Sequence, residues 1–155
     1  MLNKHFREFI ELLEKHKVRY LLVGGYAVGY HGFPRYTGGL DVFIGISHKN
    51  SERIMEVFSE FGFSDLGIGP NDLMEEEIVV EIGREPLKIQ ILTGIDGVNF
   101  EECYKNKVLF DAGNGLSIPF IAFKDLLKNK SASPRAKDKI DFAELKRIRG
   151  NIKTD

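Results

Sequence analysis

The sequence predicts an α/β fold, α+β by segregation, in which helices flank a mixed β-sheet. Two observations lead to this prediction. Short apolar runs of strand length alternate with longer stretches whose apolar residues recur three and four positions apart, the spacing of helices. Near the middle, two alternating runs face each other across a turn and predict a hairpin. The 155 residues, 43% of them hydrophobic, fit one domain over residues 1–155.

The first half of the chain contains strong start and stop signals. Gly24 and Gly25 end an apolar run, Ser47 or Asn50 suits a helix N-cap, and Gly62 suits a helix end. The elements predicted here are a helix over residues 3–17, a strand over 19–24, a short helix over 26–32, a strand over 39–45, a helix ending near 61 and a loop over 65–77.

The second half begins with the hairpin, "EIVVEIGREPLKIQIL", over residues 77–92. With Arg84 and Glu85 in the turn, Glu81 pairs with Lys88 and shares one polar face with Lys88 and Gln90. The remaining predicted elements are a short helix capped by Asn99, a two-stranded piece over 107–120 that turns at 113–115, and helices over 122–130 and 135–148.

Composition predicts a cytoplasmic protein without a membrane segment. No run approaches the ~18 apolar residues of a membrane helix. The first seventeen residues carry three acids and lack the apolar centre of a signal peptide. A single cysteine, Cys103, excludes an internal disulfide and suits a reducing compartment, where it is expected to be a buried thiol.

The formal net charge is −1, but the charge is unevenly distributed. Residues 121–155 contain ten Lys/Arg and five Asp/Glu, so a basic helical element over about 121–150 follows an acidic body. Such an element can meet a nucleotide or a nucleic acid, or it can simply be the solvated face of a helix.

The stretch "LLVGGYAVGYHGFPRYTGGLDVFIG" carries the strongest functional signal. Gly24 and Gly25 lie between a strand and a helix, where bare backbone N–H groups can bind an anion, although glycine also permits a tight turn without any ligand. Asp41 lies inside an apolar strand, where a carboxylate is costly unless it is paired or bound to a cation. Arg35 has a side chain that suits phosphate, and His31 either contacts a ligand or makes a structural hydrogen bond.

Three segments together resemble the nucleotidyltransferase family of the DNA polymerase β superfamily. They are "LLVGGYAVGYHGFPRYTGGLDVFI", "LKIQILTGIDGVNFEECY" and "DLLKNKSASPRAKDKIDFAELKRI". Within this family the chain is most similar to the minimal bacterial group that includes toxin–antitoxin nucleotidyltransferases. The resemblance implies a nucleotidyltransferase-like fold, a nucleoside triphosphate as ligand and Mg²⁺ as cofactor. Neither a P-loop nor a GxGxxG motif follows a strand.

The resemblance also assigns roles to single positions. It implies that Gly24 and Gly25 approach the triphosphate, and that Asp41 is the second acid of an acid–apolar–acid pair. The first acid position holds Gly39, and the third, on a later strand, holds Gln90. The nucleotide-binding positions are predicted to be Gly24, Gly25, Arg35, Lys88, Lys130 and Arg135; a late basic element that includes Lys128, Lys137, Asp138 and Asp141 shapes the floor of the site.

One carboxylate is therefore present where this chemistry uses three to hold two Mg²⁺ ions. Gly39 has no side chain, and Gln90 contributes a neutral carbonyl oxygen at best. Asp41 is the predicted catalytic residue and metal ligand. Glu81 is the candidate helper, although an ion pair with Lys88 is the competing prediction.

Three functions follow from this pattern. The favoured one is a nucleotidyltransferase-fold protein, degenerate in catalysis, that binds a nucleotide or a protein or RNA partner. The first alternative is an active metal-dependent enzyme that moves a nucleoside monophosphate from a triphosphate to a hydroxyl acceptor. The second is a protein that works only through an interaction surface and keeps the pocket as a relic. Fold does not decide among them.

Overall fold

Six short strands pair into one mixed sheet in the order β3-β4-β2-β1-β6-β5. The computed structural model describes residues 2–63 and 66–149. Parallel pairing joins β1 to β6 and β2 to β4, and the other neighbours are antiparallel. The strands are β1 (Tyr20–Val23), β2 (Gly39–Ile44), β3 (Val79–Ile82), β4 (Lys88–Leu92), β5 (Val108–Asp111) and β6 (Ser117–Phe120). The predicted mixed sheet with flanking helices is confirmed.

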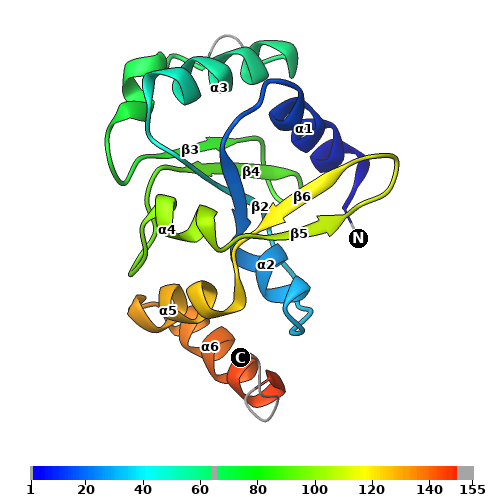
Figure 1. The fold of residues 1–155 in the computed structure, drawn as a ribbon, viewed down its shortest axis with the longest axis vertical. Coiled ribbons are helices and arrows are strands. Elements are labelled where there is room, and N and C mark those ends of the chain that lie inside the picture. Colours follow the sequence, from blue (N-terminus) through cyan, green and yellow to red (C-terminus); the bar gives the residue numbers. More distant parts are fainter. Residues whose placement is uncertain (1, 64–65, 150–155) are drawn as a thin grey trace.

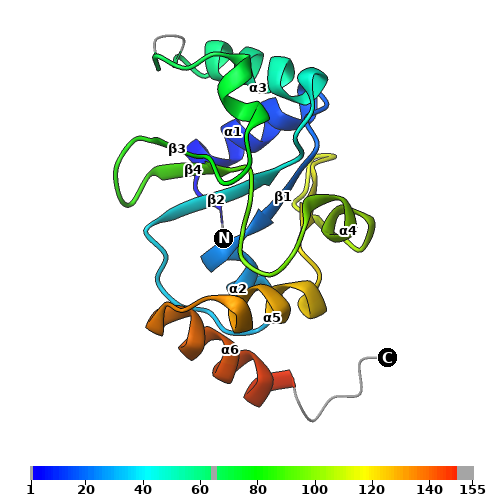
Figure 2. The ribbon, with the colours of Figure 1, turned by 90° about the vertical axis from the view of Figure 1, so that its left-hand side faces the viewer.

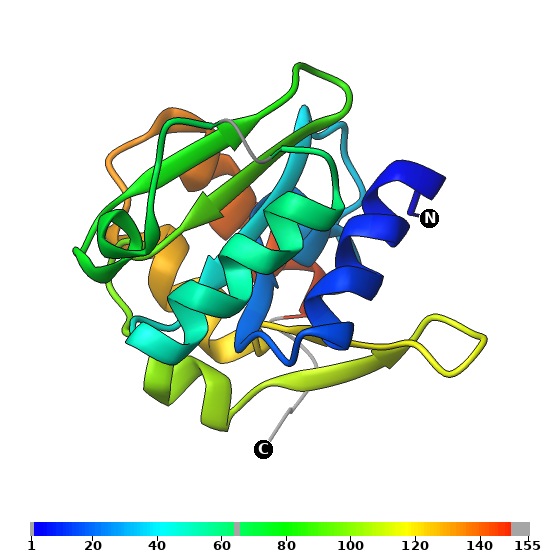
Figure 3. The ribbon, with the colours of Figure 1, turned by 90° about the horizontal axis from the view of Figure 1, so that it is seen from above.

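Helices lie on both sides of this sheet (Figures 1 and 2). Seen from above, α1 and α3 run over one face of it (Figure 3), while α2, α5 and α6 lie on the other side. The helices are α1 (Lys4–Lys15), α2 (Gly24–Tyr30), α3 (His48–Glu60), α4 (Phe100–Lys105), α5 (Phe123–Ala132), α6 (Ala136–Arg149) and a 3₁₀ helix, η1 (Pro70–Met74). The core lies on both faces of the sheet, between the strands and the helices, and β1 at the centre is buried along its whole length.

Side-chain caps set several helix starts as the sequence predicts. Asn99 accepts the Glu102 N–H at 3.0 Å at the start of α4. Ser47, not Asn50, caps α3 and accepts the Asn50 N–H at 3.0 Å. Asn50 is buried and donates to the Gly45 carbonyl at 2.8 Å, so it ties the helix to the end of β2.

The predicted hairpin forms, but its predicted register is wrong by two residues. Ile82 pairs with Ile89 and Glu81 with Gln90, so the predicted Glu81–Lys88 pair does not exist. The turn is longer than two residues: Gly83 has φ +77°, and the Leu87 N–H donates to the Arg84 carbonyl at 2.7 Å. Because a shift of two preserves the alternation of faces, Glu81 and Gln90 still share one face.

The predicted loop over 65–77 is only partly a loop. Residues 64–65 lie outside the described part of the chain, and η1 occupies the middle of the rest. The Asp72 carboxylate accepts the Gly69 N–H at 2.8 Å, and Pro70 at the first position favours a helical start. The glycines, proline and acids of this segment predicted a loop throughout. The structure instead contains a short 3₁₀ helix, because local capping by Asp72 stabilises its start.

Two predictions from composition can be compared with the structure. Within residues 2–63 and 66–149, no helix has the length and apolar character needed to cross a membrane. Cys103 is buried, and burial raises the pKa of its thiol to about 12. The thiol is therefore protonated at neutral pH and packs as a small apolar side chain, as predicted.

Candidate nucleotide site

Three neighbouring strands present one row of side chains on the same face of the sheet. Asp41 of β2 is in register with Gln90 of β4, and Gln90 is in register with Glu81 of β3. The Gln90 amide nitrogen donates to Glu81 Oε1 at 2.6 Å. Strand alternation placed Asp41 and Gln90 beside each other, and the structure does so as well.

A cavity of about 560 Å³ opens over Asp41 and Gln90 of this row, a volume typical of small-ligand sites. Its walls come from the end of β1 and the start of α2, from β2 and β4, and from α5, α6 and the loop between them. Of the predicted site residues, the cavity is lined by Gly24, Gly25, Arg35, Gly39, Asp41, Lys88, Gln90, Lys130 and Arg135. Glu81, the predicted helper, is not a lining residue.

Sequence reasoning missed several lining residues, among them Thr37, Glu85 and Asp96. They lie in connecting loops, where no periodicity marks a face. Asp96 is placed by α5, because the Asn129 side chain donates to its carbonyl at 2.9 Å. Glu85 is placed by the longer hairpin turn. No local pattern in the sequence indicates either position.

The two glycines that open α2 are explained by their neighbours. Gly24 has φ +65°, and a Cβ there would lie 2.0 Å from Asp41 Oδ2. A Cβ on Gly25 would lie 2.5 Å from the Thr37 side chain. Both positions therefore need glycine to let the start of α2 pack against β2 and the preceding loop, whether or not a ligand is bound.

Gly39 is enclosed by the neighbouring strand. A Cβ at this position would lie 2.2 Å from the Lys88 carbonyl oxygen and 2.9 Å from its carbonyl carbon. Both are backbone atoms of β4, so they cannot move without disturbing the β2–β4 pairing. The position where the resemblance places the first acid therefore has no room for any side chain.

Asp41 is surrounded by positive charge. Burial raises the pKa of its carboxyl to about 6, although the charges of Lys130, Lys88, Lys137 and Arg135 act to lower it. In the described part of the chain, Asp41 forms no ion pair. Its carboxylate therefore faces the cavity without a partner of its own.

This carboxyl should make stability depend on pH. Its pKa in the folded state, about 6, lies above its ordinary value of 3.8, so its favourable contribution is complete below about pH 4 and is lost as pH rises through 6. Asp41→Asn should therefore be more stable than the wild type at pH 8, by about 2–3 kcal/mol, and nearly equal at pH 4. Urea unfolding of both proteins across this range measures the difference. Curves that stay parallel at every pH would contradict the shift.

Arg35 and Lys130 reach the cavity, but carboxylates already bind them. Arg35 makes two hydrogen bonds of 2.7 Å to the fully buried Asp141. The Lys130 ammonium lies 2.8 Å from Asp138 and 3.0 Å from Asp141, and the Ser133 hydroxyl donates to Asp138 at 2.6 Å. This buried ion cluster joins α5 and α6 to the loop before β2.

The ion cluster lowers the pKa values of its two acids, whereas the pKa of Asp41 is raised. Burial by itself would raise the pKa of Asp138, but hydrogen bonds from Lys130 and Ser133 and nearby positive charge outweigh it and lower the pKa. For Asp141, burial is likewise outweighed by Arg35 and Lys130, and the pKa is lowered. The stability that these two acids contribute is present at neutral pH and is lost as pH falls through their folded-state pKa values.

Two lysines of the cavity wall have no such partner. Among the described residues, Lys88 and Lys137 take part in no ion pair. Lys88 is half-buried beside Gly39, and Lys137 is exposed at the start of α6. Arg135 lies 3.3 Å from Asp138 but is mostly exposed. The basic residues that face the cavity with unmatched charge are therefore chiefly these two lysines.

His31 lies away from the cavity and has a structural role. Its Nε2 donates to the Ile121 carbonyl at 2.7 Å, and its Nδ1 accepts from Arg149 at 3.0 Å. Burial lowers the pKa of the ring, which is therefore neutral at pH 7. Of the two interpretations that the sequence left open, the structure shows the structural hydrogen bond.

The residues present do not fit a pair of Mg²⁺ ions. Asp41 is the one carboxylate of the strand row that lines the cavity, Gly39 cannot carry a side chain, and the Gln90 amide is held by Glu81. The other lining acids, Glu77, Glu85, Asp96 and Asp138, lie outside that row, in loops or in α6. Among residues 2–63 and 66–149, no three His, Cys, Asp or Glu side chains are grouped as metal ligands. Mg²⁺ needs hard oxygen ligands in octahedral geometry, and this set supplies too few.

The fold defines a class of proteins. The chain has a nucleotidyltransferase-like fold, because two solved nucleotidyltransferase-type structures superpose on nearly all of it. One is TM1012, a proposed nucleotidyltransferase from Thermotoga maritima, with TM-score 0.52 and 14% identity over 94% of this chain and 84% of that one. The other is the lincosamide antibiotic adenylyltransferase LnuA with lincomycin bound, with TM-score 0.53 and 15% identity over 96% of this chain and 98% of that one. No family model and no curated protein matches the sequence.

Proposed function

We propose that this protein binds a nucleotide in the cavity over β2 and β4 and does not transfer it. The nucleotidyltransferase-like fold supports the ligand class, and LnuA, a structure of similar fold, is an adenylyltransferase. The observation that carries the loss of transfer is Gly39. Its Cβ position is occupied by the Lys88 carbonyl, so the first metal-binding acid cannot exist in this backbone.

In this proposal the cavity residues have separate roles in binding. Lys88, Lys137 and Arg135 attract the phosphates, since an ammonium or guanidinium makes strong charge-assisted hydrogen bonds to phosphate oxygens. Arg35 and Lys130 hold the wall in place through Asp141 and Asp138. The glycine turn lets the chain pass close to Asp41. None of these contacts activates an attacking hydroxyl, which a metal-bound carboxylate site would do.

The surviving carboxylate favours a second candidate, metal-dependent transfer with one acid. Mg²⁺ can be bound by one or two carboxylates together with substrate phosphates. Asp41 could then hold a single ion, with the Gln90 carbonyl oxygen as a further ligand. The four cations around Asp41 oppose this arrangement, because they repel a second positive charge.

Binding and transfer assays distinguish the two candidates. The wild type should bind ATP in calorimetry and should incorporate no label from a labelled nucleoside triphosphate into protein, RNA or small hydroxyl acceptors in Mg²⁺. Asp41→Ala is the paired control. Transfer by the wild type that disappears in Asp41→Ala would show that one acid is enough. Transfer that survives Asp41→Ala would place the chemistry elsewhere, and absence of ATP binding would overturn the proposal.

A further inference from the structure

The cavity wall carries charges of both signs: the basic residues Arg35, Lys88, Lys130, Arg135 and Lys137, and the acids Asp41, Glu77, Glu85, Asp96 and Asp138. Where the resemblance places carboxylates, β2 carries Gly39 and β4 carries Gln90, and the residue in register with Gly39 is Lys88. The charged groups that act on Asp41 are all basic: Lys130, Lys88, Lys137 and Arg135. Beside Asp41, therefore, a phosphate chain would find positive charge.

We propose that the cavity binds the phosphate chain of its ligand without a divalent metal, with the ammonium groups of Lys88 and Lys137 in place of the ions. This rests on the proposed function and adds the form of the ligand: the free polyphosphate anion rather than its magnesium complex. Lys88 and Lys137 are assigned to the phosphate chain because they line the cavity and, among the described residues, have no carboxylate partner.

The geometry explains why two lysines are available while two other cations are not. Asp141 binds Arg35 through two hydrogen bonds and also lies within 3.0 Å of Lys130. These charges are neutralised inside the protein. Lys88 is fixed at its backbone by the β2–β4 pairing, and Lys137 extends from the first turn of α6, so they approach the cavity from different elements. Two ammonium groups on separate walls can contact successive phosphates.

The test uses calorimetry with two probes, ATP and inorganic triphosphate, each in EDTA and in excess Mg²⁺. Both probes should bind in EDTA, and Mg²⁺ should weaken binding because it neutralises the anion. Lys88→Gln and Lys137→Gln keep the side-chain stem and should each weaken binding about ten-fold or more, since a charged hydrogen bond is lost. Thermal unfolding confirms that these variants are folded.

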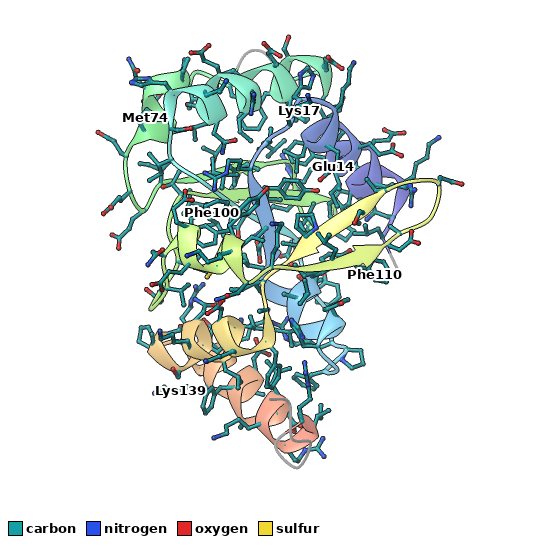
Figure 4. All side chains as sticks on the ribbon, in the orientation of Figure 1. Glu14, Lys17, Met74, Phe100, Phe110 and Lys139 are labelled. Carbon is teal, nitrogen blue, oxygen red and sulfur yellow. The ribbon has the colours of Figure 1, made fainter. Side chains whose placement is uncertain are left out.

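Lys139→Gln is the matched control. Lys139 lies on the same helix as Lys137, is exposed and does not line the cavity (Figure 4). The same charge change there should leave binding unchanged. Asp41→Asn gives the sharpest contrast, because it removes the carboxylate that a metal would need. It should tighten binding in EDTA severalfold, since the negative charge that repels phosphate is gone.

Three results would count against this assignment in different ways. Binding that requires Mg²⁺ and is lost in Asp41→Asn would overturn metal-free binding while leaving nucleotide binding intact. Binding of ATP but not of triphosphate in EDTA would show that the nucleoside, not the phosphate chain, is recognised. No binding of ATP in either condition would overturn the proposed function itself.

Discussion

Asp141→Ala is expected to lower the free energy of unfolding by about 3–5 kcal/mol. The carboxylate is fully buried and holds both Arg35 and Lys130. Its removal leaves two cations in the interior with one remaining acid, Asp138, shared between Lys130 and Arg135. An uncompensated buried charge costs far more than the ion pair contributes by itself. Urea unfolding at pH 7 measures the loss.

Glu144→Ala is the control for this prediction. Glu144 lies one turn further along α6 and pairs with Arg147 at the surface. Because solvent screens this pair, its loss should cost less than about 1 kcal/mol. Equal losses in the two variants would mean that the ion cluster contributes no more than a surface pair. Asp141→Asn should fall between them, since it keeps the shape and the acceptor but not the charge.

Gly39→Ala is expected to destabilise the protein by about 3 kcal/mol, the upper part of the range for overpacking. One methyl group would lie 2.2 Å from the Lys88 carbonyl oxygen, and the collision can be relieved only by moving β4 away from β2. The free energy of unfolding from chemical denaturation is again the measurement. The strand pairing that supports Asp41 and Gln90 should loosen with it.

Gly29→Ala provides the comparison. Gly29 lies inside α2 and does not line the cavity, and a Cβ there meets no atom within 4 Å. Alanine in helix α2 should be neutral or stabilising by up to about 1 kcal/mol. If Gly39→Ala behaved like Gly29→Ala, room for a side chain would exist and the first acid could be restored.

The effect at Gly39 decides what restoring the acids would do. The double variant Gly39→Asp with Gln90→Asp would add carboxylates at the two positions where the resemblance places the missing acids. Its first substitution collides with the backbone, and its second removes the donor that binds Glu81 and places two acids side by side. The variant should therefore be less stable and should gain no Mg²⁺-dependent transfer. Robust transfer would show that the backbone adapts.

The sequence alone determined much of the local structure. Helical and strand spacing predicted the order of nearly every element, and alternation along two strands placed Asp41 and Gln90 on one face. The missing acids were visible as Gly39 and Gln90. These features are local, because the period of a strand or a helix is set by backbone geometry within a few residues.

Tertiary structure alone decided the rest. The hairpin register depended on a turn longer than the predicted one, and a shift of two residues replaced a Glu81–Lys88 ion pair with a Glu81–Gln90 hydrogen bond. Arg35 was assigned to phosphate, yet its partner is Asp141, 106 positions away. The space at Gly39 was decided by the backbone of β4. Such contacts join residues far apart in the chain, so no periodicity in the sequence records them, and only the packing of strand on strand and helix on loop fixes them.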